Sequence, residues 1–420
     1  MVYNKECKKR VRGSAHIPRE KKEGITVKRF VYADNAATTP VSREVREAMA
    51  PCFETVWGNP SSLHQKGREA KVLLDDARLR IANVFHCTPK EIYFTSCGSE
   101  SDNWAIKGAA HRMKKKGRDE IVTTAIEHHA VLHACESLER EGFKVTYVGV
   151  DADGVVKMDE LRAAVTEKTA IVAVMYANNE IGTIEPIREI CDIAHAKGAL
   201  MFTDAVQAIG NLEIDLSKLP VDMLSLSGHK IHAPKGIGML FIRKGVVIDN
   251  LIDGGGQERG KRGGTENLPY IVGLAKALEV AEEKMADNER VARLRDRLID
   301  GLTKIPHSRL HGHRTQRLPG NVNVGFECVE GESMLLWLDL AGICVSTGSA
   351  CSSDSLEPSH VLIAIGIPHE KAHGSLRISI SHETTDEDVD YILETVPPIV
   401  EKLRQMSPLW EDLQKREHNA

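Results

Sequence analysis

Residues 222–243, DMLSLSGHKIHAPKGIGMLFIR, contain two apolar runs joined by a glycine-flanked turn. The runs DMLSLS and GIGMLFIR have the length and composition of buried strands. The turn carries Ser227, His229 and Lys230 where the first strand ends. Burial at the end of a strand can lower the pKa of a lysine, as Schiff-base chemistry requires. Lys230 is therefore a candidate for such chemistry, although most lysines in proteins are simply solvated.

The sequence around this stretch alternates apolar runs with helical patterns from residue 31 onward. Polar or glycine-rich turns often end the apolar runs, which is typical of an α/β fold. Further strands are predicted for EIYFTS (91–96), EIVTTAI (120–126), KVTYVGV (144–150), AIVAVMY (170–176) and ALMFTD (199–204). Ligands of open α/β sheets bind at the carboxyl ends of the strands, so catalytic and ligand-binding side chains are expected there.

The pattern changes after about residue 270, where a long helical stretch precedes a smaller group of strands and helices that includes NVNVGF and SLRISIS. A chain of 420 residues also exceeds what one hydrophobic core usually supports. We therefore predict a basic N-terminal extension over residues 1–30 and a large, mainly parallel domain over residues 31–270. A connecting helix and a smaller C-terminal α/β domain would occupy residues 271–420.

The composition is that of an ordinary globular protein, with 42% hydrophobic and 27% charged residues and a net charge of -5. No apolar run approaches the roughly 18 residues of a membrane span, and no leader pattern opens the chain. We expect a cytoplasmic protein without membrane contact. Residues 1–29 carry ten Lys and Arg against three Glu. Such a segment could bind nucleic acid or an acidic partner, but it lacks interleaved aromatics, so we expect a flexible, solvated extension without direct nucleic-acid binding.

The nine cysteines form no CxxC pair and no Cys/His spacing suited to zinc, so neither disulfides nor a metal site is predicted. Each thiol is then either a small buried hydrophobe or a reactive group. Cys351 lies in VSTGSACSSDSLEPSH (345–360), among small and polar residues that offer little to bury its sulfur. Composition alone does not decide which of the two Cys351 is.

Two other strand ends carry candidate ligand-binding groups. After EIYFTS, Gly98 precedes Ser99, which could form an S-x-x-D capping box with Asp102 at a helix start. Backbone N–H groups there could hold a phosphate, although ordinary caps are far more common. Asp204 and Gln207 follow ALMFTD. Asp204 could pair with a cationic ring nitrogen or simply cap the next helix.

Arg377 lies within the alternating strand GSLRISIS, where its planar guanidinium could hold a substrate carboxylate or form a salt bridge across the sheet. His128 in EHHAV could be a capping, core or catalytic histidine. A phosphate turn, a ring-nitrogen carboxylate, a Schiff-base lysine and a carboxylate-binding arginine together are what pyridoxal phosphate bound to an amino acid requires.

The chain resembles the cysteine desulfurases, which belong to the aminotransferase class V group of fold-type I pyridoxal-phosphate enzymes. The likeness is to the branch that serves nitrogenase and general iron–sulfur cluster assembly, and it covers about residues 31–405. The motifs that carry it are DNAATTP, TSCGSESDN, EHHAV, ANNEIG, DAVQ, SGHKIHAPKGIG, RGGTEN, GSACSSDSLEPSH and GSLRISIS.

The resemblance implies a role for each matching residue. Lys230 would hold pyridoxal 5'-phosphate as a Schiff base and move the Cα proton, while His128 would stack on the pyridine ring. Asp204 would pair with the ring nitrogen and Gln207 with the ring oxygen. The phosphate would be held by Gly98, Ser99, Ser227, His229 and, from the neighbouring subunit, Thr265. The substrate carboxylate and its surroundings would be held by Asn35, Asn178 and Arg377.

The same resemblance makes Cys351 the nucleophile that takes sulfur from L-cysteine as a persulfide, leaving L-alanine. Its thiolate form would be required, and its loop would have to move between the cofactor and an acceptor. The sequence departs from the family at Cys97, where glycine is usual. We expect Cys97 to lie under the cofactor and not to carry sulfur.

The resemblance also implies a homodimer and a sulfur-acceptor protein such as an iron–sulfur cluster scaffold. A selenocysteine lyase would use the same groups, so it stays an alternative. A third possibility is a non-catalytic assembly partner of the same fold. The presence of Lys230, Asp204, His128 and Cys351 together argues against that third possibility.

Overall fold

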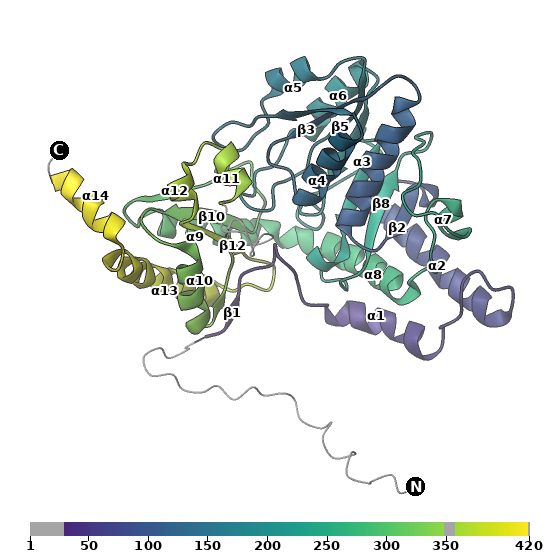
Figure 1. Ribbon diagram of the computed structural model, residues 1–420. Helices are drawn as coiled ribbons and strands as arrows, with labels where there is room; N and C mark the ends of the chain where they lie inside the picture. The colour runs from purple at the N-terminus through teal and green to yellow at the C-terminus, as the bar shows by residue number, and fades with distance from the viewer. Residues whose placement is uncertain (1–28, 348–357, 419–420) are drawn as a thin grey trace, which may run out of the picture.

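The computed structural model describes residues 29–347 and 358–418 of the chain. Its largest sheet has seven strands in the order β2-β8-β7-β6-β5-β3-β4 (Figure 1). Only β8 runs antiparallel to its neighbours, which are β2 and β7. The predicted α/β fold with a mainly parallel sheet is confirmed. The strands are β2 (Ile92–Thr95), β3 (Glu120–Thr124), β4 (Lys144–Val148), β5 (Thr169–Ala173), β6 (Leu200–Asp204), β7 (Met223–Ser227) and β8 (Gly238–Ile242).

Both faces of this sheet are covered, because alternate residues of its strands enter two different cores. Ile171 packs in a core with α3 (Gly98–Lys114) and α4 (His129–Arg140). Its neighbour Val172 packs on the opposite side of the sheet. That second core contains residues of α1 (Arg43–Glu54), α2 (Gln65–Val84), α6 (Ile187–Ala196) and α8 (Leu268–Lys284). Burial on both faces explains why the strands are apolar runs without polar alternation. Two short helices, α5 (Met158–Ala164) and α7 (Gln257–Gly260), lie in the connections.

A second, smaller unit is built around an antiparallel sheet in the order β12-β10-β9. Its core contains Leu298, Val324, Leu376 and Val396, which come from helices and strands of the C-terminal part of the chain. The strands are β9 (Ser308–Leu310), β10 (Asn321–Phe326) and β12 (Ser375–Ser379), and the helices are α9 (Asn288–Leu302), α10 (Gly331–Leu340), α11 (His360–Ala364), α12 (His369–Ala372), α13 (Asp386–Gln405) and α14 (Pro408–His418).

The beginning of the described chain also lies in this smaller unit. Strand β1 (Val31–Tyr32) pairs in parallel with β11 (Ile343–Cys344). Val31 and Ala33 are buried in the core of the smaller unit. The predicted start of the large domain at residue 31 is therefore too early. The pairing could not be predicted because a two-residue strand carries no sign of its partner, which lies more than 300 residues away.

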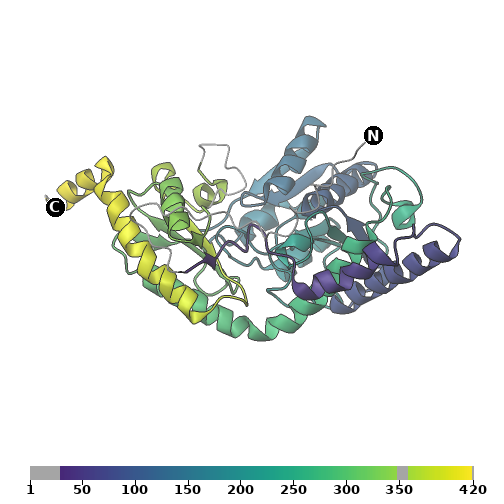
Figure 2. The ribbon, with the colours of Figure 1, turned by 90° about the horizontal axis from the view of Figure 1, so that it is seen from below.

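The predicted single connecting helix is interrupted. Helix α8 ends at Lys284, a 3₁₀ turn covers Met285–Asp287, and α9 begins at Asn288. In Figure 2 this connection runs along the lower edge of the view from one unit to the other, with a bend between the two helices. The helical period continues across the break, so the sequence pattern alone does not reveal it.

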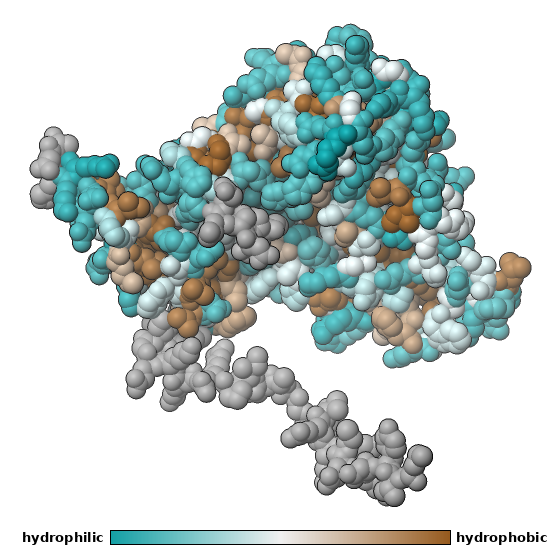
Figure 3. Space-filling view, in the orientation of Figure 1, coloured by the Kyte–Doolittle hydropathy of each residue, from teal (hydrophilic) through white to brown (hydrophobic). Residues whose placement is uncertain are grey.

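The surface drawn in Figure 3 is mostly hydrophilic, with apolar residues in small separate groups. The most exposed apolar side chains include Trp57 and Leu63, both in the connection between α1 and α2. Among the described residues, no helix combines the length and the apolar character needed to cross a membrane.

Candidate active site

A cavity of about 330 Å³ opens at the carboxyl ends of β6 and β7 and at the start of α3. It lies where open α/β sheets bind their ligands. The structure brings many of the predicted site residues together here. Those that line the cavity are Gly98, Ser99, His128, Asp204, Gln207, Ser227, His229, Lys230 and Arg377.

Lys230 enters this cavity from a 3₁₀ turn, Gly228–Lys230, that follows β7 directly. Its Nζ donates to the carbonyl oxygens of Ala36 (2.7 Å) and Ala37 (2.6 Å). A Cβ atom on Gly228 would lie 2.8 Å from the side chain of Ile237, so only glycine allows so tight a turn here. The amine is thereby held beside the cavity by two backbone acceptors.

The start of α3 differs from the sequence prediction. Cys97, not Ser99, is the N-cap residue, and its side chain makes no capping hydrogen bond. Ser99 lies inside the first turn, and Asp102 turns to the sheet, where it accepts a hydrogen bond from Ser225. The predicted Ser99–Asp102 capping box is therefore wrong. The pattern failed because the helix begins one residue before Ser99, which moves Asp102 onto the buried face.

The uncapped helix start suits an anion. Gly98 and Ser99, whose backbone N–H groups are the first of α3, both line the cavity. A Cβ atom on Gly98 would lie 3.0 Å from Val206 and 3.4 Å from Ser227, so glycine keeps this space open. Free N–H groups and the positive end of the helix dipole favour a phosphate there. Cys97 lines the same cavity beside them.

Asp204 is the last residue of β6 and is 5% exposed. Its Oδ1 accepts a hydrogen bond from the backbone N–H of Val206 at 2.9 Å. Burial raises the pKa of Asp204 to about 6, against the opposing effects of this N–H group and of Lys230. The carboxylate is therefore ionised at neutral pH and can bind a cationic ring nitrogen.

Two histidines beside Lys230 are held neutral. His128 is the N-cap residue of α4, and its Nδ1 accepts from the backbone N–H of Ala130 at 3.1 Å. Burial and the charge of Lys230 lower its pKa to about 4. His229 lies 3.1 Å from the hydroxyl of Thr38, and the same two causes lower its pKa to about 4. A neutral imidazole can pack against an aromatic ring without repelling a cation bound there.

Arg377 enters the cavity from β12 of the smaller unit and is 1% exposed. It donates to Asp34 (3.1 Å) and to the carbonyl oxygen of Asn179 (3.3 Å). Among the described residues its Nε has no hydrogen-bond partner. The salt bridge that the sequence left open is thus present, and one buried donor is still available to a carboxylate.

Asn178 and Thr265, two further predicted residues, lie outside this cavity. Asn178 is fully buried, and its side chain bonds the backbone of Ile126, Glu180 and Ile181. Asn179, not Asn178, lines the cavity. Thr265 is exposed outside the cavity. Cys351 and the loop around it lie outside the described residues, as does most of the basic N-terminal extension.

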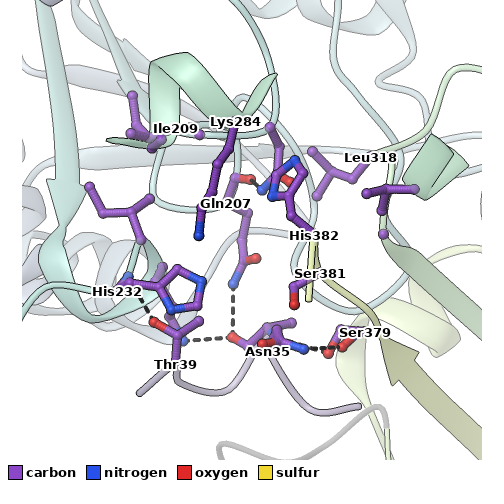
Figure 4. A pocket seen from close by; sticks show the side chains of 18 of the residues that line it. Asn35, Thr39, Gln207, Ile209, His232, Lys284, Leu318, Ser379, Ser381 and His382 are labelled. Carbon is purple, nitrogen blue, oxygen red and sulfur yellow. Dashed lines mark hydrogen bonds between the residues drawn. The ribbon is translucent and has the colours of Figure 1, made fainter. Parts of the chain in front are cut away.

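Asn35 faces a second, smaller cavity of about 80 Å³, shown in Figure 4. Its Nδ2 donates to the carbonyl oxygen of Ser379 at 2.8 Å. Gln207 donates to the carbonyl oxygen of Ala36 at 3.0 Å, which places it between this cavity and the first. Gln207 and Lys230 line both cavities and therefore lie between them.

Sequence reasoning missed three contributors to the site. Asp34 and Asn179 are sequence neighbours of the predicted residues Asn35 and Asn178. Nothing in their motifs indicates a contact with Arg377. Asp102 was noticed only as a cap. The clue to its burial was its spacing, since it shares a helix face with the buried apolar residues Ala105, Ile106 and Ala109.

The sequence profile described as aminotransferase class-V matches residues 31–392. The chain belongs to the aminotransferase class-V family. A class-V relative, "Cysteine desulfurase IscS" of Methanosarcina thermophila, is 56% identical over 91% of this chain and 95% of that protein. Another, with the same name, from Clostridium botulinum (strain Hall) is 53% identical over 92% of this chain and 98% of that protein.

Solved structures with similar sequences share the fold of this chain. A structure titled "NIFS-LIKE PROTEIN" has a TM-score of 0.84 and 42% identity, covering 89% of this chain and all of that one. One titled "SspA in complex with cysteine" has a TM-score of 0.74 and 36% identity, and the match covers 83% of this chain and 98% of that one. The predicted fold-type I architecture and the resemblance to cysteine desulfurases are confirmed.

Pyridoxal phosphate is the cofactor of these class-V enzymes, and the cavity fits it. The uncapped helix start at Gly98 suits the phosphate, the ionised Asp204 suits a protonated ring nitrogen, and Lys230 suits the covalent bond. A Cβ atom at position 98 would crowd Val206 and Ser227, which line the same cavity. The contacts of each residue with the cofactor stay a prediction.

Proposed function

We propose that this chain converts L-cysteine to L-alanine and passes the sulfur, as a persulfide on Cys351, to an acceptor protein. The chain is a pyridoxal-phosphate-dependent cysteine desulfurase of the kind that serves iron–sulfur cluster assembly. The observation that carries the proposal is one cavity that holds Lys230, the ionised Asp204, the neutral His128 and the partly unpaired Arg377.

Bound pyridoxal phosphate supplies an electron sink that makes the Cα proton of an attached amino acid acidic. Arg377 would bind the substrate carboxylate, because its buried Nε has no hydrogen-bond partner among the described residues. Lys230, positioned by two backbone carbonyls, would accept the Cα proton and return it. Asp204 would hold the ring nitrogen protonated, and the neutral ring of His128 would pack on the pyridine face.

Cys351 would act on the sulfur of the bound substrate. Its thiolate forms a sulfur–sulfur bond while the carbon–sulfur bond breaks, and the electron pair of that bond stays with the carbon. Protonation of this carbon then gives alanine, so no external oxidant or reductant is needed. The persulfide sulfur can pass to a thiolate of an acceptor by ordinary exchange.

The proposal includes a homodimer, a protein acceptor and a cytoplasmic location. Thr265 is exposed, three residues after Arg262, which binds Glu100 at the start of α3. A second subunit packed here would place its own Thr265 near the phosphate turn of its partner. Unpaired cysteines, free in the described chain, fit a reducing compartment.

The test compares two single substitutions, Cys351→Ser and Cys97→Ser. Both should keep the yellow colour of the cofactor bound to lysine. Cys351→Ser should lose protein-bound persulfide and acceptor labelling from ³⁵S-cysteine, whereas Cys97→Ser should keep at least half of each. Sulfur transfer at the wild-type rate by Cys351→Ser would remove that residue from its role.

The selenocysteine alternative is tested in the same assay. The rate of alanine formation from L-cysteine should exceed the background without enzyme, and the added acceptor should receive the sulfur. Alanine formation from L-selenocysteine alone would contradict the proposal. A protein that stays colourless with added pyridoxal phosphate would contradict every enzymatic function considered for the chain.

A further inference from the structure

The floor of the cavity contains a second buried carboxyl group that the proposed chemistry does not use. Asp102, on α3, is 1% exposed, and Asp204, on β6, is 5% exposed. One oxygen of each and one ring nitrogen of His128 lie within 4.8 Å of one another. Two ionised carboxylates this close in a buried site would repel each other strongly, so one of them holds a proton.

The surroundings decide which carboxyl group that is. Asp204 accepts a backbone N–H from Val206 and feels the positive charge of Lys230, and both favour its ionised form. Asp102 accepts a hydrogen bond from the hydroxyl of Ser225 at 2.5 Å. A neutral hydroxyl stabilises a negative charge less than an ammonium group does.

The other groups that face Asp102 also oppose its ionisation. Asp204 lies on β6, Glu127 follows β3, and Cys97 precedes α3, and each would be an anion if deprotonated. Burial and the charge of Asp204 raise the pKa of Asp102 well above its ordinary value. Glu127 has its own pKa raised to about 8 by burial, so it adds little negative charge at neutral pH.

We propose that Asp102 is a positioning residue that stays a neutral carboxylic acid, so that Asp204 alone carries the negative charge at the floor of the cavity. Ser225 holds one oxygen of Asp102, and the proton lies on the other. An ionised Asp102 would drive the shared proton onto Asp204, which could then no longer accept a hydrogen bond from a ring N–H. The inference rests on the proposed function only in giving Asp204 that ring as its partner.

The direct test is an infrared difference spectrum between the full-length holoenzyme and Asp102→Asn at pH 7.5. The wild type should show one C=O band of a protonated carboxyl group that Asp102→Asn lacks. The matched control is Asp159→Asn, which removes a fully exposed carboxyl group and should cost a carboxylate band instead. A carboxylate band lost in Asp102→Asn would overturn the proposal.

A second variant keeps the test valid if Asp102→Asn folds poorly. Ser225→Ala removes the hydroxyl donor but leaves the carboxyl group, so the protonated band should persist at a shifted frequency. Disappearance of the band in Ser225→Ala would overturn the proposal, because it would mean that the serine, and not the paired carboxylates, sets the protonation state.

Thermal unfolding provides an independent measurement. A native carboxyl group with a raised pKa holds a proton that the unfolded chain releases, so its stabilising effect is lost as the pH rises. The Tm of Asp102→Asn relative to wild type should therefore increase between pH 5 and pH 8. The same difference should stay flat for Asp159→Asn. A flat or falling difference for Asp102→Asn would contradict a neutral Asp102.

The same three groups could instead bind a divalent cation, and zinc distinguishes the two arrangements. After incubation with Zn²⁺ and dialysis, wild type and Asp102→Asn should retain the same amount of metal. One equivalent retained by wild type and lost in Asp102→Asn would overturn the proposal. None of these measurements uses cysteine, so a negative result would leave the desulfurase assignment standing.

Discussion

The floor of the cavity and the wall opposite it are built in different ways. The floor consists of Asp102, His128, Asp204 and Lys230, which come from the large sheet and its helices, and the wall consists of Asp34, Asn179 and Arg377. Asp204 and His128 each accept from a backbone N–H two residues further along the chain. Arg377 instead pairs with Asp34, 343 residues away.

The floor and the wall are therefore suited to two different tasks, cofactor binding and substrate binding. Asp204 and His128, each held by a backbone N–H group of its own turn, suit a rigid cofactor whose position must not change. Groups joined across two units suit a substrate that must enter and leave. Substitutions in the floor should therefore alter the cofactor and the chemical step, whereas substitutions in the wall should alter substrate binding.

The largest effect is expected for Asp204→Ala. Removal of a buried charged partner costs about 3 kcal/mol or more, so kcat should fall about 100-fold or further. The visible absorbance of the bound cofactor should also change. Steady-state kinetics and absorbance spectra measure both, with exposed Asp75→Ala on α2 as the control. An unchanged kcat with a raised KM would show that Asp204 acts in substrate binding, like the wall residues, and not in the chemical step.

The wall is tested by Arg377→Lys. Lysine keeps the charge but loses the planar fork, so KM for cysteine should rise about 10-fold to 100-fold with a smaller change in kcat. The absorbance of the cofactor without substrate should stay the same. Arg309→Lys, at an exposed position of β9 in the same sheet, is the control. A loss of cofactor absorbance in Arg377→Lys would break the division between floor and wall.

The pH dependence of the unfolding free energy should reveal the buried carboxyl group of Glu180, which feels the charge of the wall residue Arg377. Burial raises the pKa of Glu180 to about 7, and its carboxylate accepts a hydrogen bond from Ser359. The native protein therefore keeps a proton that the unfolded chain releases above about pH 4.3, and stability falls as the pH rises to about 7.

Glu180→Gln should remove this fall, worth about 2 kcal/mol in the unfolding free energy between pH 5 and pH 7.5. Chemical denaturation at the two pH values measures it. Exposed Glu136→Gln on α4 should change neither value. An equal pH dependence in Glu180→Gln and wild type would show that Glu180 is ionised throughout this range.

The smallest effect is expected for Ser359→Ala. Ser359 caps α11 and donates to Glu180, so its loss should cost about 1–2 kcal/mol. Ser42→Ala removes a cap from α1 that has no buried carboxylate behind it and should cost about 1 kcal/mol. Urea denaturation compares the two. Equal costs would mean that the bond to Glu180 contributes nothing beyond the cap.

The sequence predicted more residues of the floor than of the wall, because the floor residues follow recognisable strands whereas the wall residues are joined across the two units. Lys230 and Asp204 follow strands that are evident as apolar runs, so their positions at one edge of the sheet could be predicted. His128 could be placed at a helix start for the same reason. The protonation of Asp102 could not be predicted, because it depends on how α3 is turned against the sheet.

The wall depends on pairings that no local pattern reveals. The ion pair of Arg377 with Asp34 requires β1 to lie beside the small sheet, and the sequence placed β1 in the large domain. Asn178 and Asn179 were indistinguishable in ANNEIG, since only the turn conformation decides which side chain is buried. The strand order was likewise beyond the sequence, although its mainly parallel character was not.

The pairing of β1 with β11 also determines how the two units are joined. The chain passes between them twice, once near Ala36 and Ala37 and again between α8 and α9. Two covalent crossings restrict rotation of the units to fewer directions than a single linker would. The first crossing also supplies the carbonyl groups that hold Lys230. A fragment that begins at residue 271 would lose β1, the partner of β11, so the smaller unit should be produced as a separate protein only with residues 29–34 attached.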